Sequence, residues 1–225
     1  MHTVLPTSRR RQKVGILVMG LGCSAFSEQR LLNVGADWSE LVGYTVTAMC
    51  NLSLTSTLVT IAKTVCKLPP RKNTKFIQDI VTRILEHVSQ GKHVYLVGHS
   101  YGGACVMRAV EVLAELYPEI LPHLNVATFG SLYVTSLPEE VNIKHYMYTH
   151  DVALKCNRLH PNIDKKDITW LKSKTPHEHL LFGTTAEWSY HNDYIDYIMQ
   201  TFKERRKSSK RKSSNDKNKL SSTQY

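Results

Sequence analysis

The 225-residue sequence lacks several features that define whole classes of protein. No stretch approaches eighteen consecutive apolar residues, which excludes a conventional transmembrane helix. The 11 glycines and 8 prolines are too few for a collagen-like chain. The five cysteines are odd in number and widely spaced, without the pattern of a zinc site or of a disulfide-rich secreted domain. We therefore interpret them as buried free thiols in a reducing compartment, and we expect neither a metal nor an organic cofactor.

Hydrophobic residues make up 42% of the chain, which excludes a wholly disordered protein and allows one domain with a substantial core. The net charge of +10 is concentrated at the two ends: residues 1–13 carry +4, residues 202–225 carry +7, and residues 14–201 carry −1. Because the positive net charge comes from the two ends, it does not support a nucleic-acid-binding function for the core. The predicted organisation is a basic N-terminal segment (1–13), a folded domain (14–202) and a disordered basic tail (203–225).

A run of basic residues from Arg205 to Lys212 lies within this tail. Such a run is typical of a nuclear-import signal and of a segment that binds polyanions, although a solubilising disordered end has the same composition. We expect an intracellular protein, either cytoplasmic or nuclear. The opposing interpretation is a signal peptide at residues 1–26, which would make the protein secreted. We favour a strand there, because the stretch contains the turn-forming Gly20-Leu21-Gly22.

Strand-like and helix-like segments alternate through the central region. Short apolar runs predict strands at 14–19, 44–50, 93–97, 125–129 and 143–148, and apolar residues at helical spacing predict helices at 31–41, 54–68, 77–88, 104–116 and 195–202. Strands separated by helices of about ten to fifteen residues indicate βαβ units. The sequence therefore predicts an α/β domain with a mostly parallel sheet.

The most informative motif is Gly98-His99-Ser100-Tyr101-Gly102-Gly103, which directly follows one predicted strand and precedes a predicted helix. In the GxSxG nucleophile elbow, the serine occupies a strained strand-to-helix turn, and the flanking glycines, here Gly98 and Gly102, let backbones pass closely. The N-terminus of the following helix offers positive potential to a developing oxyanion. The motif predicts a nucleophilic Ser100, and an ordinary glycine-rich turn is the alternative.

A serine nucleophile needs a base and an orienting acid, which follow it along this fold in the order acid, then histidine. Asp151 is the candidate acid, because it lies just beyond the strand predicted at 143–148. Asp164 and Asp167 are weaker candidates, because they lie in a lysine-rich stretch with the character of a solvated surface loop.

The candidate base is His191, which precedes the last predicted helix, where the final loop of such folds returns to the elbow. His179 is the reserve, and His160 and His177 are further candidates. His99, inside the elbow, is expected to be structural, because it points away from the exposed face of the serine.

The oxyanion hole needs two backbone donors. One comes from Tyr101, the residue after the nucleophile, and the other from the loop after an earlier strand. Leu21 follows the strand predicted at 14–19, so its N–H is the expected second donor. A simple tight turn or a signal-peptide apolar region explains the same residues.

Four stretches of the chain resemble the class 3 triacylglycerol lipases, which are α/β-hydrolases. Residues 97–103 match their VGHSxGG form, and residues 127–131 are similar to their TFGSP segment. Residues 148–152 resemble the segment that holds the triad acid, and residues 191–194 resemble the H-x-x-Y segment that holds the triad histidine. The resemblance covers residues 93–200 and supports Asp151 and His191.

The chain departs from that family at three positions. Leu132 and Ala153 replace usual prolines, and Met19 stands where many α/β-hydrolases have histidine. The resemblance implies a reduced α/β-hydrolase fold, with a mostly parallel central sheet flanked by helices. It also implies a serine hydrolase of the lipase or carboxylesterase type that cleaves carboxylic esters, with acylglycerol-type lipids as substrates. The alternative is a catalytically silent hydrolase-fold scaffold whose basic tail binds polyanions.

Residues 52–72 are a candidate lid. Apolar residues from Leu54 to Leu68 recur at helical spacing with Lys63 and Lys67 on the opposite side, which suits a transient contact with a membrane surface. A plain amphipathic helix packed on the sheet explains the same pattern. The sequence indicates no oligomeric state.

Overall fold

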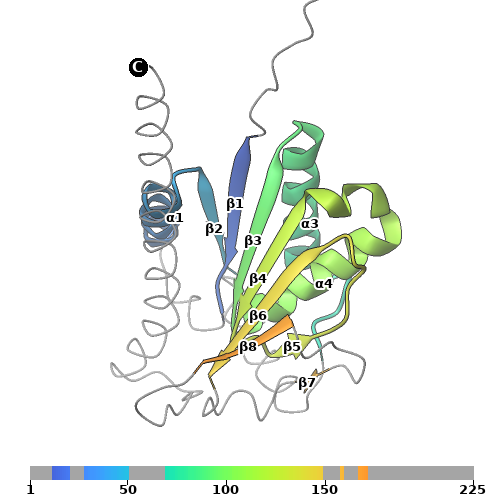
Figure 1. Cartoon of the computed structure of the whole chain (residues 1–225). Coiled ribbons are helices and arrows are strands. Elements are labelled where there is room, and N and C mark those ends of the chain that lie inside the picture. Colours follow the sequence, from blue (N-terminus) through green and yellow to red (C-terminus); the bar gives the residue numbers. More distant parts are fainter. Residues whose placement is uncertain (1–11, 21–27, 51–68, 149–157, 160–166, 172–225) are drawn as a thin grey trace, which may run out of the picture.

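The computed structural model describes residues 12–20, 28–50, 69–148, 158–159 and 167–171 (Figure 1). The helices in these ranges are α1 (Glu28–Val42), α3 (Lys75–Ser89), α4 (Tyr101–Leu116) and the 3-10 helix η2 (Pro118–His123). The strands are β1 (Lys13–Val18), β2 (Val46–Met49), β3 (His93–His99), β4 (Leu124–Phe129), β5 (Tyr133–Val134), β6 (Asn142–Tyr148), β7 (Arg158–Leu159) and β8 (Ile168–Leu171).

Six of the strands form one sheet in the order β2-β1-β3-β4-β6-β8, and every neighbouring pair is parallel. β5 and β7 pair separately in a two-stranded parallel sheet. The order reverses between β1 and β3, because β2 lies on one side of β1 and the later strands extend from the other side. In open parallel sheets, ligands bind beyond the carboxyl ends of the strands at such a reversal point.

Helices cover both faces of the sheet: α1 lies on one side, and α3 and α4 lie on the other (Figure 1). The apolar run of β1 shows why. Val14, Ile16 and Val18 belong to the core beneath α3 and α4, whereas Leu17 and Met19 pack on the side of α1. Because successive side chains of a strand point to opposite faces, a continuous apolar run produces a strand that is buried on both sides.

α3 has clear start and stop signals. The hydroxyl of Thr74 accepts a hydrogen bond from the N–H of Ile77 and caps the first turn. The buried face consists of Ile77, Ile80, Val81 and Ile84. Gly91 follows the helix with φ +72°, a conformation that glycine adopts without steric cost.

α1 is fixed against the edge strand β2 by a small residue and a hydroxyl. A Cβ on Gly35 would lie 2.9 Å from the carbonyl oxygen of Val46, so glycine allows the two backbones to approach. The hydroxyl of Ser39 donates to Gly35 O at 2.6 Å and accepts from Val46 N–H at 2.8 Å. The helix therefore satisfies a backbone donor of β2.

The predicted α/β class, with a mostly parallel sheet flanked by helices, is confirmed. Every strand and helix predicted within the described ranges is present, with ends that differ by a few residues. The sequence analysis missed η2, β5, β7 and β8, which are short and carry little periodicity. The helices predicted at 54–68 and 195–202 lie outside the described residues, as does the tail 203–225. Of the candidate lid 52–72, only its last four residues are described.

The cysteines correct one prediction. Cys50, directly after β2, is disulfide-bonded, so the interpretation of all five cysteines as free thiols is wrong. Cys105 is a buried free thiol as expected. Sequence spacing identifies zinc sites and dense frameworks, but not a bridge between residues that only the fold brings together. The cysteines thus no longer support an intracellular location, which stays a prediction. None of the helices in the described ranges is long and apolar enough to span a bilayer.

Candidate active site

Ser100 lies between the last residue of β3 and the first residue of α4, with φ 53° and ψ −125°. Among the described non-glycine residues, Ser100 alone has a positive φ. Such a conformation costs on the order of 1–3 kcal/mol in a residue with a side chain, and the surrounding structure must hold it. A strained serine at a strand-to-helix turn is the defining geometry of the nucleophile elbow.

Glycines make this turn sterically possible. A Cβ on Gly102 would overlap Val18 O and lie 2.6 Å from Met19 O, so the first turn of α4 passes directly over the end of β1. A Cβ on Gly98 would lie 2.6 Å from the Cα of Gly103. Larger residues at these positions would force the backbones of β1, β3 and α4 apart.

Gly20 brings the end of β1 to the serine. A Cβ on Gly20 would lie 2.9 Å from Ser100 Cβ, so the two residues are in contact at the reversal point of the sheet. His99 is buried beside them, with only 5% of its surface exposed. Ser100 is buried to the same degree, so the structural role expected of His99 stays a prediction.

The parallel sheet of strand order β2-β1-β3-β4-β6-β8 carries this elbow at its centre, after β3. The described part of the chain is therefore a parallel sheet with helices on both faces, and its elbow lies where the sequence predicted it.

The backbone of Ser100 is held from the neighbouring strand by residues 129–133, which we call the strap. Ser100 N–H donates to Phe129 O at 2.9 Å, and Leu132 N–H donates to Ser100 O at 3.4 Å. The same carbonyl accepts from Gly103 N–H at 3.0 Å within the start of α4. Both peptide groups next to the nucleophile are therefore fixed.

The strap begins at Phe129, the last residue of β4, and turns sharply at Gly130, which has φ +54° and donates its N–H to Tyr146 O at 2.9 Å. Ser131 is fully buried, and its hydroxyl donates to Tyr133 O at 2.7 Å. A Cβ on Gly103 would lie 2.8 Å from Ser131, so the strap packs directly on the first turn of α4.

The N-terminus of α4 provides the positive end of a helix dipole next to Ser100. The Ser100 side chain makes no capping hydrogen bond to the helix, and only 6% of the residue is exposed. Burial raises the pKa of the Cys105 thiol, one turn further along α4, against a smaller lowering by its hydrogen bond with Tyr101. Cys105 therefore stays protonated at neutral pH and is no competing nucleophile.

Of the predicted site residues, the structure brings together Gly98, Ser100, Tyr101 and Gly102. Leu21, Asp151 and His191 lie outside the described residues. So do the alternatives Asp164, His160, His177 and His179. Their roles stay predictions.

The structure argues against Asp167 as the acid. This residue directly precedes β8, which is three strands away from β3, about 14 Å across the sheet. β6, which precedes Asp151 in the sequence, is one strand nearer to β3 than β8 is, and Asp151 itself lies outside the described residues. In the part of the chain that the structure describes, no group of three or more His, Cys, Asp or Glu could hold a metal ion.

The residues that support the elbow were not predictable from the sequence. In the sequence, the strap is visible only as a resemblance, and no local pattern predicts the polar cluster of Arg108, Glu111 and Tyr133 behind it. The available signal, Arg108 and Glu111 three residues apart on a mostly apolar helix, indicates an ion pair and no more. Their connection to Tyr133 depends on the packing of β5 on α4.

No protein-family model matches the sequence, and no curated protein matches it. Two solved structures are similar in their chain path. One is a provisionally described hydrolase of the alpha/beta superfamily from Xanthomonas campestris pv. campestris, 15% identical with a TM-score of 0.38, covering 85% of this chain and 99% of that one. The other is RedJ with a polyethylene glycol molecule in its active site, 12% identical with a TM-score of 0.39, covering 87% and 97%. Similarity this low identifies neither a family nor an activity.

Proposed function

We propose that the protein is a serine hydrolase that cleaves carboxylic esters through an acyl-enzyme intermediate. The observation that carries the proposal is the strained conformation of Ser100 at the N-terminus of α4. Strain of this kind persists where surrounding contacts enforce it, and it clusters at active sites. Here the glycines of the elbow and the strap enforce it on a residue whose hydroxyl has no capping role.

In the proposed mechanism, the Ser100 hydroxyl attacks the ester carbonyl while His191 takes its proton. His191 then returns the proton to the leaving alcohol, and Asp151 orients the imidazole. The N–H groups of Tyr101 and Leu21 hold the oxyanion, aided by the positive end of the α4 dipole. Water activated by His191 then hydrolyses the acyl-enzyme and regenerates the serine.

Lipid esters of the acylglycerol type are the proposed substrates, and this part of the proposal rests on the resemblance to class 3 lipases. An ester panel of increasing acyl length would test it. Preference for long acyl chains presented in micelles supports a lipase, whereas preference for short soluble esters supports a carboxylesterase.

The burial of Ser100 favours one alternative function. A nucleophile with 6% of its surface exposed also fits a catalytically silent scaffold that keeps the elbow for structural reasons. In that case, polyanion binding by the tail 203–225 is the working activity. Such binding falls steeply as salt concentration rises.

Labelling with a fluorophosphonate probe and intact-mass detection distinguishes the two functions. We expect one adduct on the wild type and on Ser89→Ala, which alters an exposed serine at the end of α3, and none on Ser100→Ala. No adduct on folded wild-type protein, with or without detergent micelles, would reject the hydrolase and leave the scaffold.

A further inference from the structure

We propose that Tyr133 is a positioning residue for the nucleophile: it fixes the strap on α4 and thereby holds Leu132 N–H against Ser100 O. The proposal rests on the proposed function in one respect, because the position of Ser100 matters for catalysis only if Ser100 reacts. Tyr133 is the last residue of the strap and the first residue of β5. Its side chain is engaged by Glu111 and Arg108 of α4, so the role that we propose for it is indirect.

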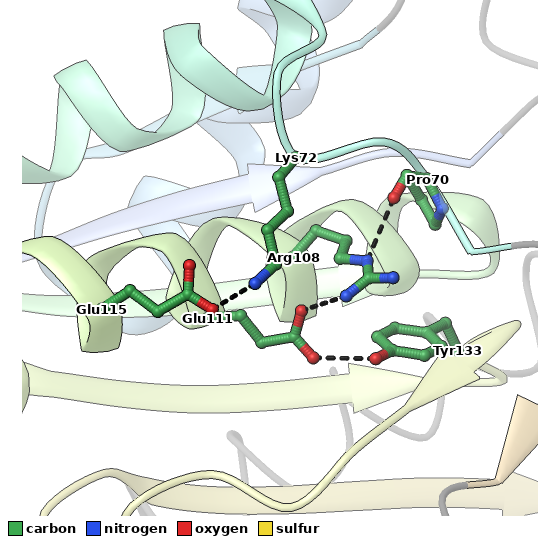
Figure 2. A network of polar contacts seen from close by, with 6 residues as sticks. All are labelled: Pro70, Lys72, Arg108, Glu111, Glu115 and Tyr133. Atoms are coloured by element: carbon green, nitrogen blue, oxygen red, sulfur yellow. Dashed lines mark hydrogen bonds and ion pairs between the residues drawn. The ribbon is translucent and has the colours of Figure 1, made fainter.

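Figure 2 shows Tyr133 held on α4 through both its hydroxyl and its ring. The hydroxyl donates to Glu111 Oε1 at 2.7 Å, and Glu111 Oε2 pairs with Arg108. The Arg108 guanidinium lies 4.6 Å from the centroid of the Tyr133 ring, a cation–π contact. Arg108 Nε also donates to Pro70 O at 3.0 Å, so the same cluster fixes the segment before α3.

The Arg108–Glu111 pair is protected from water, which makes it a firm anchor. The two side chains are 17% and 14% exposed, against 38% and 60% for the neighbouring Lys72–Glu115 pair. Burial raises the pKa of the Tyr133 hydroxyl, and Glu111 raises it further. The hydroxyl therefore stays protonated at neutral and mildly alkaline pH and continues to donate to Glu111.

One residue of the strap, Leu132, connects the anchored Tyr133 to the nucleophile. Leu132 lies between buried Ser131 and anchored Tyr133, and its N–H reaches Ser100 O at 3.4 Å. A hydrogen bond of this length is near its limit, so a shift of a few tenths of an ångström would break it. Leu132 thus supplies a donor to the carbonyl of the nucleophile, and Tyr133 controls the position of that donor.

The test uses Tyr133→Phe, which removes the hydroxyl and keeps the ring. Glu115→Gln is the matched control, because it breaks the exposed ion pair with Lys72 on the same surface and leaves Tyr133 anchored. Tyr117→Phe removes a different hydroxyl just beyond α4. Fluorophosphonate labelling, measured well below every variant's unfolding temperature, gives a maximal labelling rate and a half-saturating probe concentration.

We expect Tyr133→Phe to lower the maximal labelling rate by about tenfold, with an unchanged half-saturating concentration. Both controls should stay within about twofold of the wild type. Leu132→Pro removes the N–H directly. The reductions in labelling rate caused by Leu132→Pro and by Tyr133→Phe should therefore not add in the double variant. Leu132→Ala, which keeps the N–H, should retain most of the rate. A Tyr133→Phe protein that melts earlier but labels at the wild-type rate would overturn the proposal.

Hydrogen exchange separates this proposal from the proposed function. Peptides covering residues 97–104 and 129–134 should exchange faster in Tyr133→Phe than in the wild type or in Glu115→Gln. If wild-type protein takes no label, the hydrolase proposal fails, yet faster exchange at the elbow still supports the role of Tyr133. Unchanged exchange in both peptides would reject that role whether or not the protein reacts.

Discussion

The hydroxyl of Thr128 on β4 lies 2.7 Å from Nδ1 of His145 on β6, and both residues are completely enclosed by the protein. The two residues are register partners in the sheet. Burial lowers the pKa of His145 to about 4, because no charge on the imidazole can be solvated there. The fold therefore requires a neutral histidine two strands from the nucleophile.

This requirement predicts that stability falls in mild acid. The pKa of His145 is lower in the folded protein than the unfolded value of about 6.5, so the unfolded chain binds the proton first as pH falls. The free energy of unfolding is unaffected above pH 6.5 and falls by up to about 3 kcal/mol as the pH approaches 4. Urea denaturation at pH 7 and at pH 4.5 would measure the difference.

The control for this prediction is His145→Gln, which keeps a polar side chain and cannot titrate. The variant should lose stability at pH 7 but show a smaller loss between pH 7 and pH 4.5 than the wild type. His87→Gln removes another histidine whose pKa is lowered, chiefly by burial, at the end of α3. Equal pH dependence in wild type and His145→Gln would mean that other groups control the acid response.

The close approach of α4 to β1 predicts that Gly102→Ala is severely destabilising. The added methyl group would overlap Val18 O and meet Met19 O, and neither backbone can move without opening the sheet. We expect a loss of about 3 kcal/mol or more, or failure to fold. Gly91→Ala is the control, because nothing lies within 4 Å of its added Cβ and only its φ of +72° is unfavourable. It should cost about 1 kcal/mol. Similar urea midpoints for the two variants would contradict the steric argument.

The sequence predicted the central strands and helices because their apolar runs and periodic faces are long. β1 is an example, since Val14 to Val18 is buried on both faces and needs no other context. β8 was missed because its four residues follow a charged stretch and become a strand only by pairing with β6. The disulfide bond of Cys50 was missed for a related reason, because the fold and not the local sequence brings bonded cysteines together.

The elbow was predictable because one local motif encodes it: GxSxG specifies residue sizes at fixed spacing around a single turn. The Thr128–His145 pair depends instead on the register between β4 and β6, and the strap on the pairing of β3 with β4. A one-residue slip of either pair would separate these groups. Alternation along a strand tells which face a residue occupies, but not its partner on the next strand.

The burial of Cys105 predicts that its thiol does not react in the folded protein. Burial raises its pKa, so almost no thiolate exists at neutral pH. Iodoacetamide followed by peptide mapping should leave Cys105 unmodified in native buffer and modify it fully in denaturant. Rapid native modification at Cys105 would mean that the start of α4 opens, and it would complicate any assignment of probe adducts to Ser100.

The strain at Ser100 predicts different stabilities for two substitutions that both abolish labelling. Ser100→Ala keeps a Cβ in a conformation with φ 53° and ψ −125°, so the strain remains. Ser100→Gly relieves it, and even after the greater flexibility of glycine in the unfolded chain we expect this variant to be about 1 kcal/mol more stable than Ser100→Ala. Urea denaturation of both variants beside the wild type measures the difference. A functional nucleophile held at a cost in stability gives this order, whereas equal stability of the two variants would show that the elbow stores no strain.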